Sequence, residues 1–169
     1  PADTKFDIYI VDGGSTDGTV ESVKTQFPHV NIKTVDGVFW NRGMIEAWKM
    51  AEEKKRNGCN YDYYLWLNDD TFIYKDCIAS LLRVSLLKKN RTIVLGSTVD
   101  TQTRSKLTYG GRDKTGKVAR PSSDDSPVPV IMMNGNIVLV PHSVYKKLGT
   151  LDPYYTHARG DFDYGLRAR

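Results

Sequence analysis

The sequence predicts an α/β fold in which a mainly parallel sheet is flanked by helices on both faces. Short apolar segments alternate with helical segments up to residue 95, which is the order that builds such a sheet. The chain has 169 residues, 40% of them hydrophobic, which is enough for one domain with its own core. Polar clusters follow directly after two of the apolar segments, where open α/β sheets bind their ligands.

The first part of the chain predicts strands and helices in strict alternation. Each strand is a short apolar run, and each helix carries apolar residues at every third or fourth position. The helix over residues 41–56 shows this best, with Ile45, Trp48 and Ala51 on one side and Asn57-Gly58 as its stop signal. The strands are expected at residues 6–11, 30–35, 63–67 and 92–95, and the helices at residues 16–26, 41–56 and 77–89, the last capped by Asp76.

The alternation breaks in the second part of the chain. Residues 100–127 are rich in Thr, Ser, Gly, Asp and Lys and contain no long periodic segment, so we expect a β-rich or irregular excursion there. Two further strands are predicted at residues 130–133 and 136–140. Pro141 is expected to begin a short helix, which Gly149 ends. Because no repeat or low-complexity linker interrupts the chain, residues 1–169 are expected to form a single domain.

Composition and charge exclude several classes of protein. The 24 Lys and Arg residues against 20 Asp and Glu give a net charge of +4, but the basic residues are scattered, so no nucleic-acid partner is expected. Two cysteines exclude a disulfide-dense scaffold and a four-thiolate zinc site, and they favour free thiols in a reducing, cytoplasmic compartment. No apolar run approaches the roughly 18 residues that span a bilayer.

The first polar cluster, DGGSTDGT, begins at Asp12 at the end of the first strand. Its glycines allow a tight turn, and Ser15 or Thr16 can cap the helix that follows. The cluster lacks the spacing of a dinucleotide fingerprint and the lysine of a P-loop. Two interpretations stay open: a simple strand-to-helix turn, or a turn whose Asp12 carboxylate accepts hydrogen bonds from a nucleotide base.

The second polar cluster, Asn68-Asp69-Asp70, follows the apolar strand YYLWL. Adjacent carboxylates at the end of a strand repel each other, and a hard divalent cation such as Mg²⁺ or Mn²⁺ would remove that repulsion. The alternative is an Asx-type turn in which Asp70 or Thr71 caps the chain. From these residues alone the two interpretations are equally supported.

The third polar cluster, GDFDYGLR, contains two aspartates two positions apart. On a helix, Asp161 and Asp163 would point in different directions, so one can face a cleft while the other faces solvent. The alternative is that both stabilise the positive start of the helix. Upstream, Asn134 and Gly135 interrupt an apolar stretch, as happens at a bulge beside a site.

Together these clusters resemble the inverting glycosyltransferases of family 2. IYIVDGGSTDGTV is similar to the strand and DDGSTDGT element of that family, and FWNRGMIEAW is similar to the helix start that comes next. YLWLNDDTF resembles the DxD element. The segment from VIMMNGN to GDFDYGLRAR resembles the acceptor-side strand and the later ED helix. These motifs stand in the family's order across nearly the whole chain.

The resemblance implies a GT-A type, Rossmann-like fold, a nucleotide-diphosphate sugar donor, a divalent cation (Mg²⁺ or Mn²⁺) and inversion at the anomeric carbon. It implies an acceptor hydroxyl on a glycan or a lipid-linked molecule, as in polysaccharide biosynthesis. Asp161 would be the general base and Asp70 the metal ligand. The donor side would comprise Asp12, Gly14, Arg42, Asn68 and Asp69, and the acceptor side Asn134, Gly135, His157 and Asp163. For His157, a structural role in its loop is the alternative.

Three positions depart from the family pattern. Gly13 stands where the family has a second aspartate, and Asn68 stands for the first acid of the DxD element. Gly160 stands where the family has the glutamate of the ED element. In the family, the charge of that glutamate would raise the pKa of the neighbouring aspartate, here Asp161, by like-charge repulsion.

The ends of the chain also depart from the family pattern. Family members have a further apolar strand before the segment that starts at Phe6, and they continue beyond the segment that ends at Arg169. We therefore expect a catalytic domain trimmed at both ends, in which the strand over residues 6–11 lacks its first-strand neighbour. Peripheral association with the inner face of a membrane would then involve regions outside this segment.

Two other functions compete with sugar transfer. A domain that binds a nucleotide sugar or a glycan without turnover is favoured by Gly13 and Gly160. A nucleotidyltransferase would share the sheet and the acid pair, but the Gly- and Lys-rich loop of that class is absent.

Overall fold

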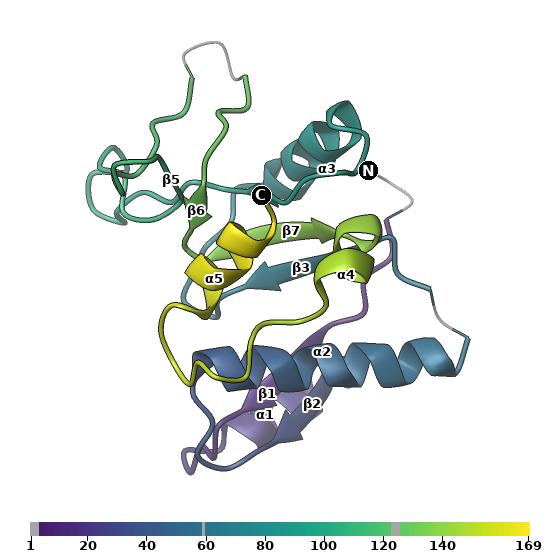
Figure 1. Ribbon diagram of the computed structural model, residues 1–169. Helices are drawn as coiled ribbons and strands as arrows, with labels where there is room; N and C mark the ends of the chain where they lie inside the picture. Colours follow the sequence, from purple (N-terminus) through teal and green to yellow (C-terminus); the bar gives the residue numbers. More distant parts are fainter. Residues whose placement is uncertain (1–3, 59, 123–125) are drawn as a thin grey trace. The chain divides into compact units, whose positions relative to one another are not determined.

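The computed structural model describes residues 4–58, 60–122 and 126–169, and it divides into two compact units (Figure 1). The first unit comprises the chain up to Asn60 together with Thr150–Gly160. The second unit comprises Tyr61–Gly149 and Asp161–Arg169. Of the two cysteines expected as free thiols, Cys77 is free, and Cys59 lies outside the described residues.

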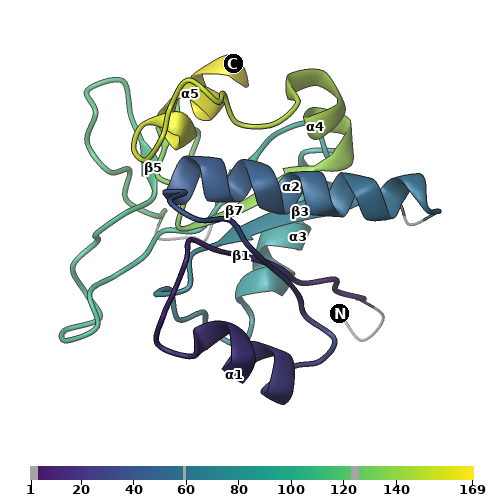
Figure 2. The same ribbon diagram turned by 90° about the horizontal axis from the view of Figure 1, so that it is seen from below.

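The first unit contains one parallel strand pair and two helices. Its elements are β1 (Tyr9–Asp12), α1 (Thr19–Gln26), β2 (Asn31–Thr34) and α2 (Trp40–Arg56). β1 pairs in parallel with β2 in the register Tyr9 to Asn31 through Asp12 to Thr34. α1 and α2 lie on opposite faces of this pair (Figure 1, Figure 2). β1 and β2 can pair in parallel because α1 lies between them and returns the chain to the start of β2.

Helix α2 buries the apolar stripe that the sequence predicts. Ile45, Trp48 and Ala51 are buried along one side of it, and Asn41 continues the same stripe into the first turn. Next to this stripe, Glu46 forms an ion pair of 3.2 Å with Lys33 of β2. An exposed pair of this kind contributes little to stability, so the buried stripe is what holds α2 in place.

The start of α1 corrects the prediction that Ser15 or Thr16 caps it. The N-cap is Gly18, which has a φ of 85° and offers no side chain for capping. Instead, Asp17 accepts hydrogen bonds from the backbone N–H and the hydroxyl of Thr19, at 3.0 and 2.6 Å. The helix therefore begins three residues later than expected, because the left-handed glycine redirects the chain just before it.

The second unit is built around a three-stranded antiparallel sheet. Its strands run in the order β3-β7-β4, and a two-stranded pair, β5-β6, stands apart from them. The elements of this unit are β3 (Tyr63–Leu67), α3 (Cys77–Leu87), β4 (Val94–Leu95), β5 (Gly111–Arg112), β6 (Met132–Met133), β7 (Ile137–Pro141), α4 (His142–Leu148) and α5 (Gly160–Arg167), of which Gly160 is assigned to the first unit.

The described strand pairs do not show the predicted mainly parallel sheet, since only β1 and β2 pair in parallel. β3 and β4 run in the same direction, as the helix between them requires, but β7 inserts between them antiparallel to both. The physical reason is the excursion after β4, which brings the chain back without the crossover helix that a parallel strand needs. Among the described strands, β1 pairs with β2 alone and β3 with β7 alone.

Side chains from the two faces of the β3-β7-β4 sheet pack into different layers. On one face, Leu81 of α3 packs with Val94, Ile137 and Leu139. On the other face, Trp66 of β3 meets the fully buried Tyr164 of α5, with ring centroids 5.1 Å apart. β7 is buried along its whole length, as expected of a central strand covered on both sides. Trp48 and Trp66 are both buried in the cores of their units.

Two further expectations are corrected around β7. The polar break at Asn134 and Gly135 is no bulge within one strand, because it separates β6 from β7, which belong to different sheets. Pro141 is the last residue of β7 and the N-cap of α4, one position before its expected place. Gly149, with a φ of 70°, ends α4 as predicted. Within the described ranges, no helix is both long and apolar enough to cross a bilayer.

Tyr164→Phe is expected to lower the free energy of unfolding by about 1 kcal/mol. The buried Tyr164 hydroxyl donates a 3.0 Å hydrogen bond to the carbonyl of Gly149, and burial raises the pKa of this tyrosine. Urea denaturation monitored by tryptophan fluorescence measures the change. Tyr154→Phe is the matched control, because that side chain is 84% exposed. Equal urea midpoints for Tyr164→Phe and the unmodified chain would contradict the expectation.

Candidate functional site

Asp12 lies at the end of β1 in the first unit, and its carboxylate organises the turn that follows. The side chain is buried and accepts hydrogen bonds from the backbone N–H groups of Gly14, at 3.1 Å, and Ser15, at 3.1 and 3.2 Å. The Ser15 hydroxyl, followed by these backbone groups, lowers the pKa of Asp12. The residue therefore has the turn role that the sequence leaves open.

The two glycines after Asp12 bring this turn against the turn that follows β2. A Cβ on Gly13 would lie 3.0 Å from the carbonyl oxygen of Val38, and Gly14 has a φ of 105°. The backbone N–H of Gly37 donates a 3.1 Å hydrogen bond to the carbonyl of Gly13. This close approach gives a physical reason for glycine at position 13, where the family pattern has an aspartate.

The start of α2 carries Arg42 at the same end of the first unit. Arg42 is exposed in the first turn of the helix, and that turn contains no acidic residue. The helix follows directly on the Val38 turn that touches Gly13, so the structure brings Asp12, Gly14 and Arg42 to one end of this unit. A cation at the positive end of a helix is unfavourable by itself, and an anionic ligand would offset that cost.

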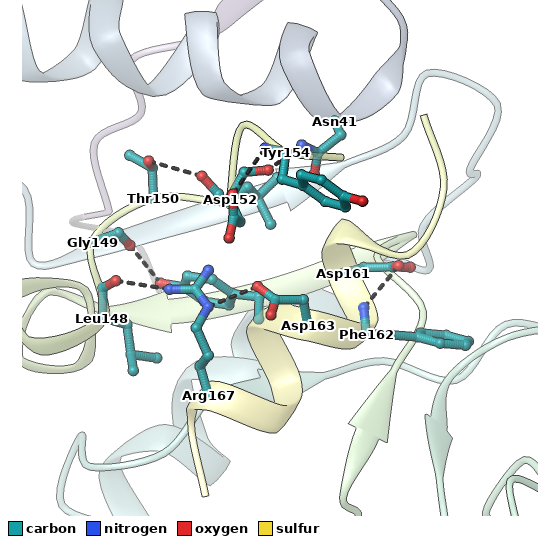
Figure 3. A network of polar contacts seen from close by, with 12 residues as sticks. Asn41, Leu148, Gly149, Thr150, Asp152, Tyr154, Asp161, Phe162, Asp163 and Arg167 are labelled. Atoms are coloured by element: carbon teal, nitrogen blue, oxygen red, sulfur yellow. Dashed lines mark hydrogen bonds and ion pairs between the residues drawn. The ribbon is translucent and has the colours of Figure 1, made fainter. Parts of the chain in front are cut away.

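Asn41, also in the first turn of α2, is a functional candidate that was not predicted from the sequence. Its side chain is fully buried, and its amide nitrogen donates to the carbonyls of Asp152, at 2.9 Å, and Tyr155, at 2.7 Å (Figure 3). It thereby ties the loop after α4 to α2. In the same unit, the ring of His157 lies edge-on to Phe39, with centroids 5.7 Å apart. A detectable signal was present: Asn41 is a polar residue on the apolar stripe of α2.

Asn68, Asp69 and Asp70 form a turn at the end of β3 in the second unit. The backbone N–H of Asn68 donates to the carbonyl of Asn136 at 3.0 Å, and the N–H of Thr71 donates to the carbonyl of Asn68 at 3.1 Å. Asp69 and Asp70 are exposed, and neither takes part in an ion pair among the described residues. The Asn68–Asp70 turn therefore presents two adjacent carboxylates that have no cationic partner among the described residues.

These carboxylates fit a metal held jointly with a substrate. No group of three or more His, Cys, Asp or Glu residues in the described part of the chain could hold a metal ion by itself. Mg²⁺ is usually bound through one or two carboxylates, with water and substrate phosphates as the other ligands. Asp69 and Asp70, which are adjacent and exposed, match this kind of partial ligand set, and they do not match an all-protein cage.

Asp161 is held in the first turn of α5 by two backbone donors. Its Oδ2 accepts from the N–H of Gly135 at 2.9 Å, and its Oδ1 accepts from the N–H of Phe162 at 2.9 Å. Burial raises the pKa of Asp161, and the two backbone bonds and the charge of Arg112 oppose that rise without cancelling it. Desolvation thus makes this carboxylate more basic in the absence of the family's neighbouring glutamate.

Asp163 points to a different partner, as the spacing on a helix predicts. It forms an ion pair of 2.7 Å with Arg167, one turn later in α5 (Figure 3). Arg167 also donates to the carbonyl of Leu148 at 3.0 Å. The structure therefore joins Asp163 to the end of α4, and it joins Asp161 to the turn after β6.

Arg112 is the second candidate residue that was not predicted from the sequence. From β5, its Nε donates to the Oδ1 of Asn134 at 3.0 Å, and its Nη1 donates to the carbonyl of Gly116 at 2.7 Å. Residues 100–127 show no periodicity, so nothing in the sequence pattern distinguishes this arginine from its neighbours. The structure thus gathers Arg112, Asn134, Gly135 and Asp161 around one turn, and the adjoining Asn136 contacts Asn68.

Comparison with known proteins adds one match. The model of the family described as glycosyl transferase family 2 matches residues 2–136. That range includes Asp12, Arg42, the Asn68–Asp70 turn and Asn134, and it stops before Asp161. None of the curated proteins matches the chain significantly.

Proposed function

The chain belongs to glycosyl transferase family 2, and on that premise we propose that it transfers a sugar, with inversion, from a nucleotide-diphosphate sugar to an acceptor hydroxyl. The observation that carries the proposal is Asp161: a half-buried carboxylate with a raised pKa, fixed in direction by two backbone donors. Inverting transfer needs a base of this kind and no covalent intermediate on the enzyme. The family implies the α/β fold of GT-A type.

Asp161 would act as the general base. The acceptor hydroxyl loses its proton as its oxygen attacks the anomeric carbon, so the carboxylate must lie within hydrogen-bond reach of that hydroxyl. A raised pKa increases the strength of the base, and the backbone donors restrict its rotation. Because burial causes the rise, the missing glutamate at position 160 does not argue against this role.

We propose separate donor-binding roles for residues of the first unit and for residues of the second unit. Asp12 would accept hydrogen bonds from the base, and Gly14 and Arg42 would lie along the phosphates at the same end of the first unit. Asn68 and Asp69 would support the sugar and the cation, and Asp70 would be the metal ligand. A bound Mg²⁺ or Mn²⁺ supplies charge neutralisation for the departing nucleoside diphosphate. This role of Asp70 is supported by its exposure beside Asp69.

The acceptor side is proposed on Asn134, Gly135, His157 and Asp163. Asn134 and Gly135 are supported by their contacts in the turn that holds Asp161. His157 and Asp163 have structural partners in Phe39 and Arg167, so their acceptor roles rest on the family pattern. We propose a glycan or a lipid-linked acceptor, a cytoplasmic location at the inner face of a membrane, and one catalytic domain over residues 1–169. The free Cys77 thiol supports a reducing compartment.

Removal of the divalent cation is expected to abolish donor binding and hydrolysis. Titration calorimetry with UDP-, GDP- and dTDP-sugars, with Mn²⁺ and with excess EDTA, measures this directly. Asp70→Asn should weaken Mn²⁺-dependent donor binding by a factor of roughly 10 to 100. Asp76→Asn is the control, since Asp76 is an exposed aspartate at the start of α3 that makes no side-chain capping bond.

The same experiment separates the competing functions. Mn²⁺-dependent hydrolysis of one of these donors supports a transferase. Binding without any turnover would favour the binding-domain alternative. If none of the nucleotide sugars binds with or without Mn²⁺, the proposed donor class is wrong.

A further inference from the structure

We infer that Arg112 is a positioning residue for the transfer reaction: it braces the Asn134–Gly135 turn against Asp161 and places a fixed positive charge beside that carboxylate. The inference rests on the proposed role of Asp161 as the base. It concerns an arginine in the excursion between β4 and β6, and all of its contacts lie within the second unit.

The hydrogen bonds form a chain from Arg112 to Asp161. The Nε of Arg112 donates to the side-chain oxygen of Asn134 at 3.0 Å. The next residue, Gly135, donates its backbone N–H to Oδ2 of Asp161 at 2.9 Å. The N–H of Asn134 itself donates to the carbonyl of Gly110 at 3.1 Å, so Asn134 is bound both to the residue before β5 and to the side chain of Arg112. Moving Arg112 would therefore move the donor that orients the carboxylate.

The guanidinium is itself held in a fixed place. Its Nη1 donates to the carbonyl of Gly116 at 2.7 Å, which closes the loop after β5 around it. Its carbon lies 5.7 Å from the ring centroid of Phe162, the residue after Asp161. A planar guanidinium can make directed hydrogen bonds and face an aromatic ring at once, which a lysine ammonium cannot reproduce. The arginine thus connects β5, the turn after β6 and α5.

Arg112 also supplies the positive charge that acts on Asp161. The turn over residues 134–136 contributes no titratable side chain, and on α5 the nearest acid, Asp163, is paired with Arg167. The charge of Arg112 lowers the pKa of Asp161, while burial, the larger effect, raises it. Removing the arginine charge should therefore raise the pKa of Asp161 further. A base is active only when deprotonated, so activity should then fall away at a higher pH than in the unmodified chain.

The test uses two neutral variants, one charged variant and one control. Arg112→Met removes both the charge and the hydrogen bonds, and Arg112→Gln removes the charge but keeps an amide donor. Arg112→Lys keeps the charge without the planar fork. Arg91→Met removes an exposed arginine elsewhere in the same unit and serves as the control. Two readouts are taken on the full chain: the pH profile of kcat/KM with the nucleotide sugar that gives turnover, and NMR titration of the Asp161 carboxyl carbon without substrate.

We expect both neutral variants to move the acid limb of the profile, and the Asp161 titration, to higher pH. On the plateau, kcat should fall by about tenfold to a hundredfold with little change in the KM for the donor, as expected of a misplaced base. Arg112→Lys should restore the position of the acid limb but not the full kcat, and Arg91→Met should match the unmodified chain.

The two readouts separate the failure of this inference from the failure of the proposed function. If the neutral variants fold and titrate Asp161 at the unmodified pH, the positioning role of Arg112 is wrong, whatever the activity. If Arg112→Met does not fold, the comparison of Arg112→Gln with Arg112→Lys decides the question in the same way. Full transfer by Asp161→Asn would instead refute the base assignment, and the NMR titration would still report whether Arg112 acts on Asp161.

Discussion

Asp161→Asn is expected to lower the rate of sugar transfer by roughly 10²- to 10⁴-fold, the usual contribution of a general base. Asparagine is nearly the same size as aspartate, and its amide oxygen can still accept a hydrogen bond from Gly135 or Phe162. It cannot take a proton from the acceptor hydroxyl. The loss should therefore appear in kcat, with the donor affinity measured by calorimetry unchanged.

Stability should show that this loss is chemical. Because burial raises the pKa of Asp161, the folded chain binds this proton more tightly than the unfolded chain does. The contribution to stability is thus present below the ordinary aspartate pKa of about 3.9, and it is lost as the pH rises through the folded-state pKa. At neutral pH the charged carboxylate is a cost, so Asp161→Asn should melt at a higher temperature than the unmodified chain.

Thermal melts at pH 7 and pH 3 check this linkage. The advantage of Asp161→Asn should be present at pH 7 and absent at pH 3. Asp62→Asn, which changes an exposed aspartate beside β3, is the control for a change of net charge. A variant that retains full transfer would contradict the proposed role of Asp161. A variant that is unfolded at pH 7 would contradict the expected gain in stability.

The local elements were predictable where a single segment carries its own signal. β3 has the expected bounds, Tyr63–Leu67, because a strongly apolar run ends abruptly in Asn68-Asp69-Asp70. α2 matches within one residue, because its apolar stripe and its Asn57-Gly58 stop are both local. The direction of β7 was not predictable in this way. Its sequence shows that it is buried on both faces, but which strands it pairs with depends on how the irregular excursion returns the chain.

In the candidate site too, some residues carry a local sequence signal and others depend on contacts with distant segments. Asp161 could be proposed because it stands in a recognisable acidic cluster at a helix start. Arg112 could not, because its role depends on contacts with Asn134, 22 positions away, and with Phe162. Asn41 belongs to a recognisable helix start, yet its partners are carbonyls more than 110 positions further along the chain. Contacts between distant segments are what the single sequence does not encode in any local pattern.

Gly160→Ala is expected to be among the most destabilising single substitutions in the chain. A Cβ at this position would overlap the side-chain oxygen of Asn41 and lie 2.6 Å from its Cγ. Asn41 cannot easily give way, because it is fully buried and its amide nitrogen is bound to two carbonyls. Overpacking of a buried site costs about 1–3 kcal/mol, and more where the neighbour is fixed. The space that the family's glutamate would need at position 160 is thus filled here by Asn41.

A double-mutant cycle tests whether these two residues depend on each other. Asn41→Ala alone leaves the carbonyls of Asp152 and Tyr155 without their donor, at a cost of about 1–3 kcal/mol. In the double variant the new methyl group occupies the vacated space. The stability lost in the double variant should therefore be smaller than the sum of the two single losses by about 1–3 kcal/mol. Urea denaturation of the four proteins gives the coupling free energy. Gly43→Ala on α2, whose Cβ would meet nothing within 4 Å, is the control and should be neutral or stabilising. Additive costs would mean that the Asn41 side chain is not what keeps residue 160 a glycine.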